Sequence, residues 1–174
     1  MTKNHQLILS KASGGCGCLL LIICIIGLGP MLDYLLFEPQ NQARKAKQSE
    51  AKEYLRSINK SQRAYFAEKS VFSNYVKDLE IGLRTETTNY NYSVRATKKA
   101  AFSYGISNQK DLKGYIGGVF VVPGKEFAPN AAKHQIRTNS ILCQADSPGT
   151  ITPAELTYKN GRFACGQGTI EVIK

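Results

Sequence analysis

The apolar run at residues 16–37 constrains the fold of this chain more than any other feature. It consists of CGCLLLIICIIGLGPMLDYLLF, and its purest part, residues 18–31, has no charged side chain. A helix needs about 20 mostly apolar residues to cross a bilayer. The run reaches this length when Asp33 lies at the interface, and Pro30 is acceptable where neighbouring groups satisfy the backbone. The run therefore predicts a single membrane-spanning helix within residues 16–40.

The centre of this run is made of branched aliphatic side chains, and no cleavage signal follows it. A secretory signal would end in a small-x-small site, but the chain continues as Tyr-Leu-Leu-Phe-Glu-Pro. A lipoprotein signal would place its cysteine after the run, whereas Cys16 and Cys18 precede it. An uncleaved anchor is favoured over both, and a buried core helix is the remaining alternative. The predicted anchor residues are Leu19, Leu20, Leu21, Ile22, Ile23, Ile25, Ile26 and Leu28.

Two more cysteines, Cys143 and Cys165, lie near the C-terminus with 21 residues between them. Two cysteines at this spacing, with no second pair, do not make a zinc site. Outside the cytoplasm they are expected to form a disulfide, and two buried free thiols are the alternative. Basic residues stand on both sides of the anchor, so the positive-inside rule indicates the orientation only weakly. The cysteine pair favours a head outside the cytoplasm.

Residues 41–68 contain neither Gly nor Pro and predict a long amphipathic helix, with Pro39 near its start. Apolar residues recur at spacings of three, four and seven, which places them on one face. The other face is rich in Lys and Arg, and the chain has a net charge of +10. A solvated basic surface is the ordinary explanation of such a stripe. The apolar positions are Ala43, Ala46, Ala51, Tyr54, Leu55, Ile58, Tyr65 and Phe66.

The spacing of apolar residues changes to two after residue 88. Such alternation predicts an antiparallel meander of strands joined by short turns. Residues 69–88 form a connector ahead of it, with four spaced apolar anchors, and residues 124–139 form a polar connection. The connector anchors are Phe72, Leu79, Ile81 and Leu83. The predicted strands are residues 90–95, 102–107, 115–122 and 140–145, followed by short Gly-punctuated pieces at 161–166 and 169–173.

One long helix laid on one antiparallel sheet gives an α+β head. Four aromatic residues, Tyr90, Tyr92, Phe102 and Tyr104, alternate along the first two strands. We expect all four on the face that the helix covers, and we favour a core over an RNA-stacking platform. The predicted organisation is a short tail at residues 1–15, an anchor at 16–40 and a head at 41–174.

The sequence contains no recognisable catalytic or cofactor motif. His5 and His134 are isolated, and there is no GxSxG, HExxH or Walker loop. The acidic residues Asp78, Glu80 and Glu86 cluster on the connector, where solvated acids are common. We therefore expect no enzymatic activity, no cofactor, no bound metal and no small-molecule substrate.

As a set, these features and several short motifs resemble the type IV pilin-like G and H family. The resemblance covers roughly residues 41–172 and implies a pilin-like head behind an N-terminal helix. It rests on NQARKAKQSEAK at 41–52, Tyr65-Phe66, Phe72-Ser73, TETTNYNYSVRATKKA at 85–100, Tyr104-Gly105, GYIGGVFVVP at 114–123, ILC at 141–143, SPGT at 147–150 and Cys165-Gly166.

The N-terminus departs from the pattern that this resemblance implies. Pilins share a processing site in which a glycine precedes an aromatic residue, and a glutamate occupies the fifth mature position. Here Gly17 would precede the cut, Cys18 would come first, and Ile22 would stand in place of the glutamate. The same register puts Pro39 where pilins have their helix proline. Gly17 and Cys18 are therefore the candidate processing site, without the carboxylate that guides assembly.

The resulting hypothesis is a non-enzymatic, membrane-anchored pilin-like subunit, a minor or accessory component of a type IV pilus or secretion pseudopilus. Its expected partners are membrane lipid and other pilin-like subunits, in homo- or hetero-oligomers, and nucleic acid is not expected. Its expected location is the bacterial inner membrane, with the head periplasmic or extracellular. The alternative is a tethered module that binds anionic polymers, such as DNA or polysaccharide, and does not assemble into filaments.

Overall fold

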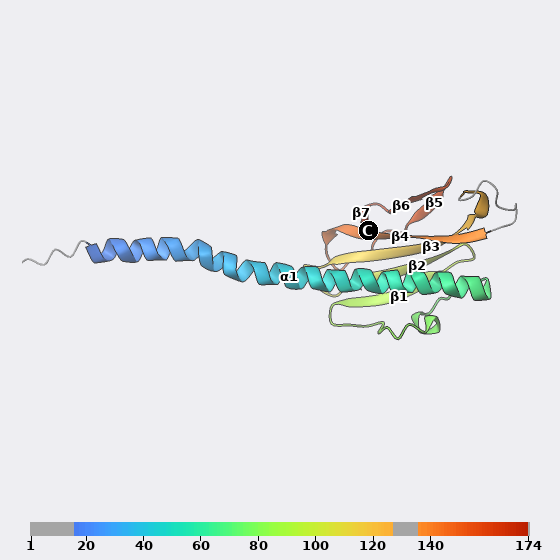
Figure 1. The fold of residues 1–174 in the computed structure, drawn as a ribbon, viewed down its shortest axis with the longest axis horizontal. Helices are drawn as coiled ribbons and strands as arrows, with labels where there is room; N and C mark the ends of the chain where they lie inside the picture. Colours follow the sequence, from blue (N-terminus) through green and yellow to red (C-terminus); the bar gives the residue numbers. More distant parts are fainter. Residues whose placement is uncertain (1–15, 127–135, 174) are drawn as a thin grey trace, which may run out of the picture. The chain divides into compact units, whose positions relative to one another are not determined.

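The computed structural model describes residues 16–126 and 136–173, with side chains over residues 39–125 and 136–173. The chain divides into two compact units, Met1–Gln42 and Ala43–Lys174. In the first unit the described backbone belongs to helix α1 (Cys16–Lys69), which ends in the second unit. The second unit, called the head below, contains every strand that the structure describes (Figure 1).

The part of α1 inside the head forms because nothing in its sequence interrupts a helix and one stripe of it can be buried. No Gly or Pro occurs between Asn41 and Lys69. The buried stripe includes Ala51, Leu55 and Ile58, which confirms these positions of the predicted apolar face. Ala43 and Ala46, predicted on the same face, are exposed. The helix ends where Ser70 adopts a positive φ of 59° and donates its backbone N–H to the carbonyl of residue 66 at 2.8 Å.

The head is built on a five-stranded sheet in the order β1-β2-β3-β4-β7, in which every neighbouring pair is antiparallel. The predicted α+β class and meander are therefore confirmed. A separate pair, β5 and β6, forms a small hairpin. The elements are β1 (Tyr90–Ala96), β2 (Ala100–Ser107), β3 (Lys113–Pro123), β4 (Ile136–Pro148), β5 (Thr157–Lys159), β6 (Arg162–Ala164) and β7 (Thr169–Glu171), with short 3-10 helices η1 (Val76–Leu79) and η2 (Gly124–Glu126).

Strand β4 is longer than the sequence predicted. The expected strand covers residues 140–145, and residues 136–139 belong to the predicted polar connection. The structure extends β4 to both sides because β3 offers eleven residues for pairing, and Pro123 of β3 lies opposite Ile136 of β4. Polar residues such as Thr138 and Asn139 are acceptable here because they are only half-buried.

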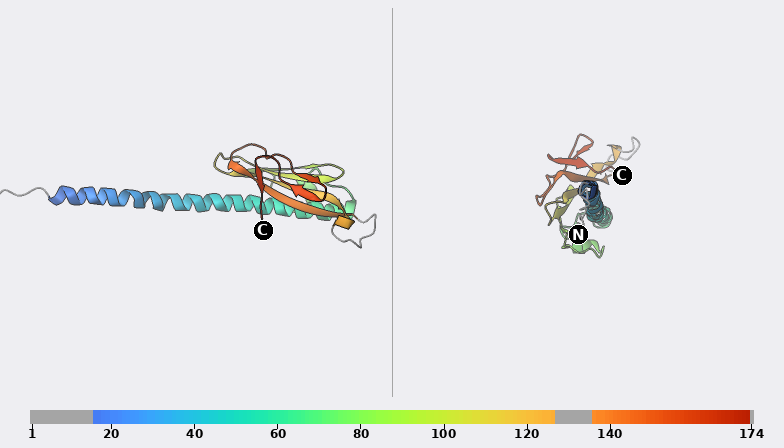
Figure 2. Two further views of the ribbon diagram at one scale, coloured as in Figure 1. Left: turned by 90° about the horizontal axis from the view of Figure 1, so that it is seen from above. Right: turned by 90° about the vertical axis from the view of Figure 1, so that its left-hand side faces the viewer.

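The sheet is covered on both faces, and the prediction that one face carries all four aromatics is wrong. Tyr90 and Tyr92 pack with Leu55 on the α1 face. In the register of β1 and β2, Tyr92 lies opposite Gly105, so Phe102 and Tyr104 point to the other face. There they pack with Leu156 and with residues of the β5–β6 region. Figure 2 shows α1 on one side of the sheet and the β5–β6 hairpin on the other.

The connector between α1 and β1 is anchored as predicted. Phe72 and Leu79 are buried, and Ile81 and Leu83 pack against the core from half-buried positions. The connector also adds a bridge at the sheet edge, where Glu86 pairs with Asn91 of β1. The outer edge of β1 is therefore partly occupied by the chain's own backbone.

Candidate interaction surface beside helix α1

The buried stripe of α1 contains two amide side chains that bond to the rest of the head. Asn59 is 5% exposed; it accepts a hydrogen bond from Ser103 Oγ of β2 at 2.8 Å and donates one to the Ile141 carbonyl of β4 at 3.3 Å. Gln62 is 1% exposed; it donates to the Ser73 carbonyl at 2.7 Å and accepts from the Ser73 N–H at 3.1 Å. These bonds fix α1 against two strands and the connector.

The close approach of Asn59 to the sheet depends on a glycine in β3. A Cβ atom on Gly117 would lie 2.4 Å from Ser103 Oγ and 2.6 Å from Asn59 Nδ2. A side chain at this position would therefore occupy the space of the amide. Asn59 and Gln62 escape prediction when the buried face of the helix is assigned by apolar residues alone. Their positions were visible in the spacing, since Asn59 follows Leu55 by four residues and Gln62 precedes Phe66 by four.

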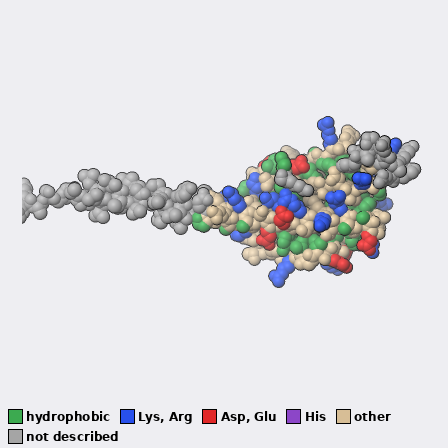
Figure 3. Space-filling view, in the orientation of Figure 1, with side chains coloured by type: hydrophobic (Ala, Val, Ile, Leu, Met, Phe, Trp, Pro, Cys, Tyr) green, Lys and Arg blue, Asp and Glu red, His purple; other side chains and the backbone are tan. Residues whose placement is uncertain are grey.

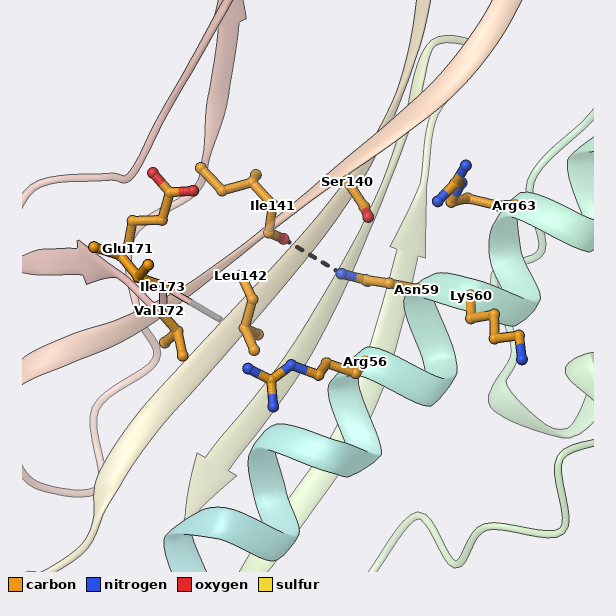
Figure 4. A pocket seen from close by; sticks show the side chains of 10 residues that line it. All are labelled: Arg56, Asn59, Lys60, Arg63, Ser140, Ile141, Leu142, Glu171, Val172 and Ile173. Atoms are coloured by element: carbon orange, nitrogen blue, oxygen red, sulfur yellow. Dashed lines mark hydrogen bonds between the residues drawn. The ribbon is translucent and has the colours of Figure 1, made fainter.

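Beside this polar contact, a groove runs between α1 and β4. It comprises two cavities, one of about 440 Å³ and one of about 410 Å³, which share Arg63 as a wall. We call them together the edge groove. Figure 4 shows the first cavity, with Asn59 pointing from α1 to Ile141 and three cationic side chains placed along the helix. The groove is lined by Arg56, Asn59, Lys60, Arg63, Phe66, Ala67 and Ser70 of α1, by residues 136–138 and 140–142 of β4, and by residues 171–173.

The edge groove is basic. Arg56, Lys60 and Arg63 line it from the helix and Arg137 lines it from β4, against a single carboxylate, that of Glu171. Arg56 is paired with Glu53 of the preceding helical turn. Among the described residues, Lys60, Arg63 and Arg137 form no ion pair. Figure 3 shows Lys and Arg side chains gathered over the face that carries α1.

On the opposite face of the sheet, a charged cluster is fully engaged in local contacts. Glu155 forms an ion pair with Arg95, and its Oε1 accepts a hydrogen bond from the Tyr104 hydroxyl at 2.9 Å. The Arg95 guanidinium also lies 4.8 Å from the centre of the Phe102 ring. The pKa of the Tyr104 hydroxyl is raised, first because it is desolvated. These contacts attach the segment before β5 to the sheet.

A disulfide joins Cys143 of β4 to Cys165, the pairing that the sequence predicted. The two Cα atoms are 5.9 Å apart, and Cys143 is fully buried. Both cysteines pack in the cluster that contains Phe120 and Phe163. The bond therefore holds the β5–β6 hairpin against the sheet face away from α1.

Three tyrosines are buried under α1 as neutral phenols. Tyr90 and Tyr115 are each 1% exposed, and Tyr92 is 4% exposed. Burial raises the pKa of Tyr115 to about 12. Burial is also the main reason why the pKa values of Tyr90 and Tyr92 are raised, and nearby phenols and Glu50 raise them as well. The Tyr90 hydroxyl donates to the Lys113 carbonyl at 3.0 Å.

Several residues named from the sequence lie outside the residues whose side chains the structure describes. The side chains of the candidate processing site, Gly17 and Cys18, and those of the predicted anchor, residues 19–28, are not described, and neither are His5 and His134. Where side chains are described, no helix is long and apolar enough to cross a bilayer. The same described part contains no cluster of three or more potential metal ligands. Asp78, Glu80 and Glu86 are exposed on the connector.

The fold defines a class of protein. A long helix that packs its C-terminal half on an antiparallel sheet, followed by a disulfide-closed C-terminal segment, is the pilin-like architecture. Residues 48–166 match the description of the type IV pilin-like G and H family, and the chain belongs to that family. No curated protein and no solved structure matches the chain.

Proposed function

We propose that this protein is a membrane-anchored, non-enzymatic structural subunit, a minor or accessory component of a type IV pilus or secretion pseudopilus. One observation carries the proposal: a single helix, α1, contains both the predicted anchor and the stripe that packs on the sheet. Family membership over residues 48–166 supports the same role. The anchor would lie in a bacterial inner membrane, with the disulfide-bonded head on the oxidising side.

In assembly, apolar N-terminal helices of neighbouring subunits would pack together in the membrane. Small residues allow helix backbones to approach each other closely in lipid, and Gly27 and Gly29 fall inside the apolar run. Ile22 replaces the glutamate that guides assembly in pilins, so this subunit would enter a filament by packing alone. An apolar residue avoids the large desolvation cost of a buried carboxylate, which fits a subunit that resides permanently in the bilayer.

The decisive experiment is to fractionate cells that express the native protein and to isolate their filaments by shearing. The expected result is that the protein is found in the membrane fraction, that it cross-links to pilin-like subunits, and that it is present at low abundance in sheared filaments. A protein found only in the aqueous fraction would overturn the proposal. Presence in the membrane but complete absence from filaments and from cross-linked subunits would favour the tethered anionic-polymer module.

N-terminal sequencing of the membrane form tests the processing site separately. An intact Met1 would indicate a permanent anchor, and a start at Cys18 would indicate cleavage after Gly17.

A further inference from the structure

The edge groove is bounded by a strand that lacks a partner over half its length. β3 pairs with β4 from residue 136 to residue 148. On its other side β4 pairs with β7 only at Cys143–Ala145. Two further bonds flank this pairing: the Val172 N–H donates to the Leu142 carbonyl and the Asp146 N–H donates to the Gly168 carbonyl, each at 2.9 Å. Figure 1 shows β7 beside only one end of β4. Within the described residues, no strand lies next to positions 136–141 on that side.

The backbone groups at this open edge belong to alternate residues. Because Leu142 bonds outward to Val172, the residues two and four positions earlier in an extended strand also direct N–H and C=O outward. These residues are Ser140 and Thr138, and Ile136 continues the series. The Ser140 N–H donates to the neighbouring Asn139 side chain at 2.8 Å, a local bond that an added strand would replace. An edge of this kind is a template for another strand.

Helix α1, which forms the wall of the edge groove opposite β4, places cationic side chains along the groove. The first cavity joins Arg56 to residues 140–142, and the second joins Ser70 to residues 136–138, so α1 and β4 run antiparallel along the groove. The fourteen steps from Arg56 to Ser70 cover about 21 Å of helix, and the six steps from Ile136 to Leu142 cover about 20 Å of strand. Lys60 and Arg63 are about 4.5 Å apart along the helix axis, and their long, flexible side chains can reach carboxylates that repeat about every 6.8 Å at alternate positions of a strand.

We propose that the edge groove binds an extended acidic segment of a partner protein, which adds a strand to β4 over residues 136–141. The added backbone would bond to the outward groups of Thr138 and Ser140. Carboxylates at alternate positions of the segment would face Lys60 and Arg63 on α1. Side chains between them would point to the opposite face of the sheet. On the α1 face the segment would also cover Ile136, which is 56% exposed. About six residues would fill the groove.

Two observations select a polypeptide from a partner as the occupant. Backbone donors and acceptors along an open strand edge can be satisfied in series by another polypeptide, whereas duplex DNA or a polysaccharide would use only the cations. The chain's own acidic pair, Asp78 and Glu80, is not available, because Leu79 between them is buried and Asp78 accepts a bond from Ser73 Oγ at 2.8 Å. The proposal does not require that the protein enters a filament.

The test uses the full-length protein in detergent micelles and a fluorescein-labelled peptide of eight residues that alternates Glu and Val. Binding is measured by fluorescence anisotropy at low salt. A second peptide has the same sequence with every amide N-methylated, so it keeps its charges and loses its donors. A labelled duplex DNA reports binding by charge alone. We expect the first peptide to bind at least about tenfold more tightly than the other two probes.

Charge-reversal variants locate the site. Lys60→Glu with Arg63→Glu should weaken binding of the acidic peptide by at least about tenfold, because both cations lie in the groove. Lys98→Glu with Lys99→Glu, at the exposed turn between β1 and β2, changes the net charge equally and should alter affinity by less than about twofold. Equal weakening by both pairs of substitutions would overturn the proposal. Equal binding of the N-methylated peptide or of DNA would also overturn it, since strand addition would then contribute nothing.

Thr138→Pro gives an independent variant, because it removes an outward N–H without removing a bond to β3. Loss of peptide binding with an unchanged thermal unfolding midpoint supports strand addition. Unchanged peptide binding by this folded variant would contradict it. The peptide-binding test does not use membrane or filament fractionation. A failure of the strand-addition proposal is therefore distinguishable from a failure of the proposed structural role.

Discussion

Asn59 connects three elements of the head through one side chain. Its amide accepts from Ser103 of β2 and donates to Ile141 of β4, while its backbone belongs to α1. Both bonds are buried, so neither group has water as a substitute partner. A rotation or translation of α1 along the sheet would break both bonds. Asn59 therefore sets the position of the helix on the sheet as well as contributing to stability.

Replacing Asn59 by Leu should lower the free energy of unfolding by about 1–3 kcal/mol, because the Ser103 hydroxyl loses its acceptor in a buried site. Ser103→Ala should have an effect of similar size, because it leaves the Asn59 oxygen unsatisfied. The double variant should lose clearly less than the sum of the two. Urea unfolding followed by tyrosine fluorescence measures all three. Strict additivity would contradict the inferred coupling between Asn59 and Ser103.

The buried tyrosines predict a loss of stability in alkali. An exposed phenol in the unfolded chain titrates near pH 10, whereas burial raises the pKa of Tyr115 to about 12 in the folded head. Below pH 10 both states keep the proton and the stability is fully present. Above pH 10 the unfolded chain releases protons first, so the free energy of unfolding falls by up to about 1.4 kcal/mol per pH unit for each such tyrosine.

Urea unfolding between pH 8 and pH 12 checks this prediction. Above pH 10, the free energy of unfolding of the Tyr115→Phe variant should fall less steeply with pH than that of the wild type, because one titrating phenol is removed. Tyr75→Phe is the matched control, because Tyr75 is 62% exposed. If the free energy of unfolding fell equally steeply with pH in the wild type and in the Tyr115 variant, the raised pKa of Tyr115 would be contradicted.

At the scale of elements, the sequence predicts what depends on periodicity and misses what depends on packing partners. The period of α1 and the alternation in β1 identified these elements and their order, because each buries one stripe or one face. β5 was missed because a three-residue strand has too short a pattern to detect. The core on the sheet face away from α1 is not predicted, for a related reason. Phe102 and Tyr104 are covered by an irregular segment around Leu156, and no local pattern indicates that contact.

The edge groove illustrates the same limit. The basic stripe of α1 was visible in the sequence, but its pairing with an open part of β4 was not. Residues 136–139 were expected in a connection, so the strand edge that faces Arg63 was not anticipated. Residues 136–139 become part of a strand because they pair with residues 120–123 of β3, and the sequence of either segment alone does not indicate this pairing.

The disulfide should matter most for the elements that it attaches. Cys143→Ala with Cys165→Ala should lower the free energy of unfolding by about 3 kcal/mol, because the unfolded chain regains the freedom of the closed loop. Reduction of the wild type should shift its urea midpoint to that of the double variant. Thiol labelling without reductant should leave both cysteines unmodified. Ready labelling of both in the extracted protein would contradict the bridge.

At the scale of the whole molecule, the chain consists of two units that share one helix. The core residues of the head and its disulfide all belong to the second unit, so we expect deletion of residues 1–40 to leave the head folded. The deletion should also move the protein from the membrane fraction to the aqueous fraction, because it removes the apolar run. Fractionation followed by circular dichroism of the released head measures both effects. A truncated head that stays with the membrane would show that residues 16–40 are not the anchor.

The double burial of β2 has a consequence for how the chain tolerates change. In β1, side chains that are mostly exposed, such as Asn91, Ser93 and Arg95, separate the buried ones. In β2, every side chain from Ala100 to Tyr104 is buried, since neighbouring positions serve opposite cores. A scan of lysine substitutions across both strands, scored by protease resistance, should show a period of two in β1 and an unbroken block of failures in β2. Over these five consecutive residues of β2, the chain therefore has no position at which a charged side chain could reach solvent.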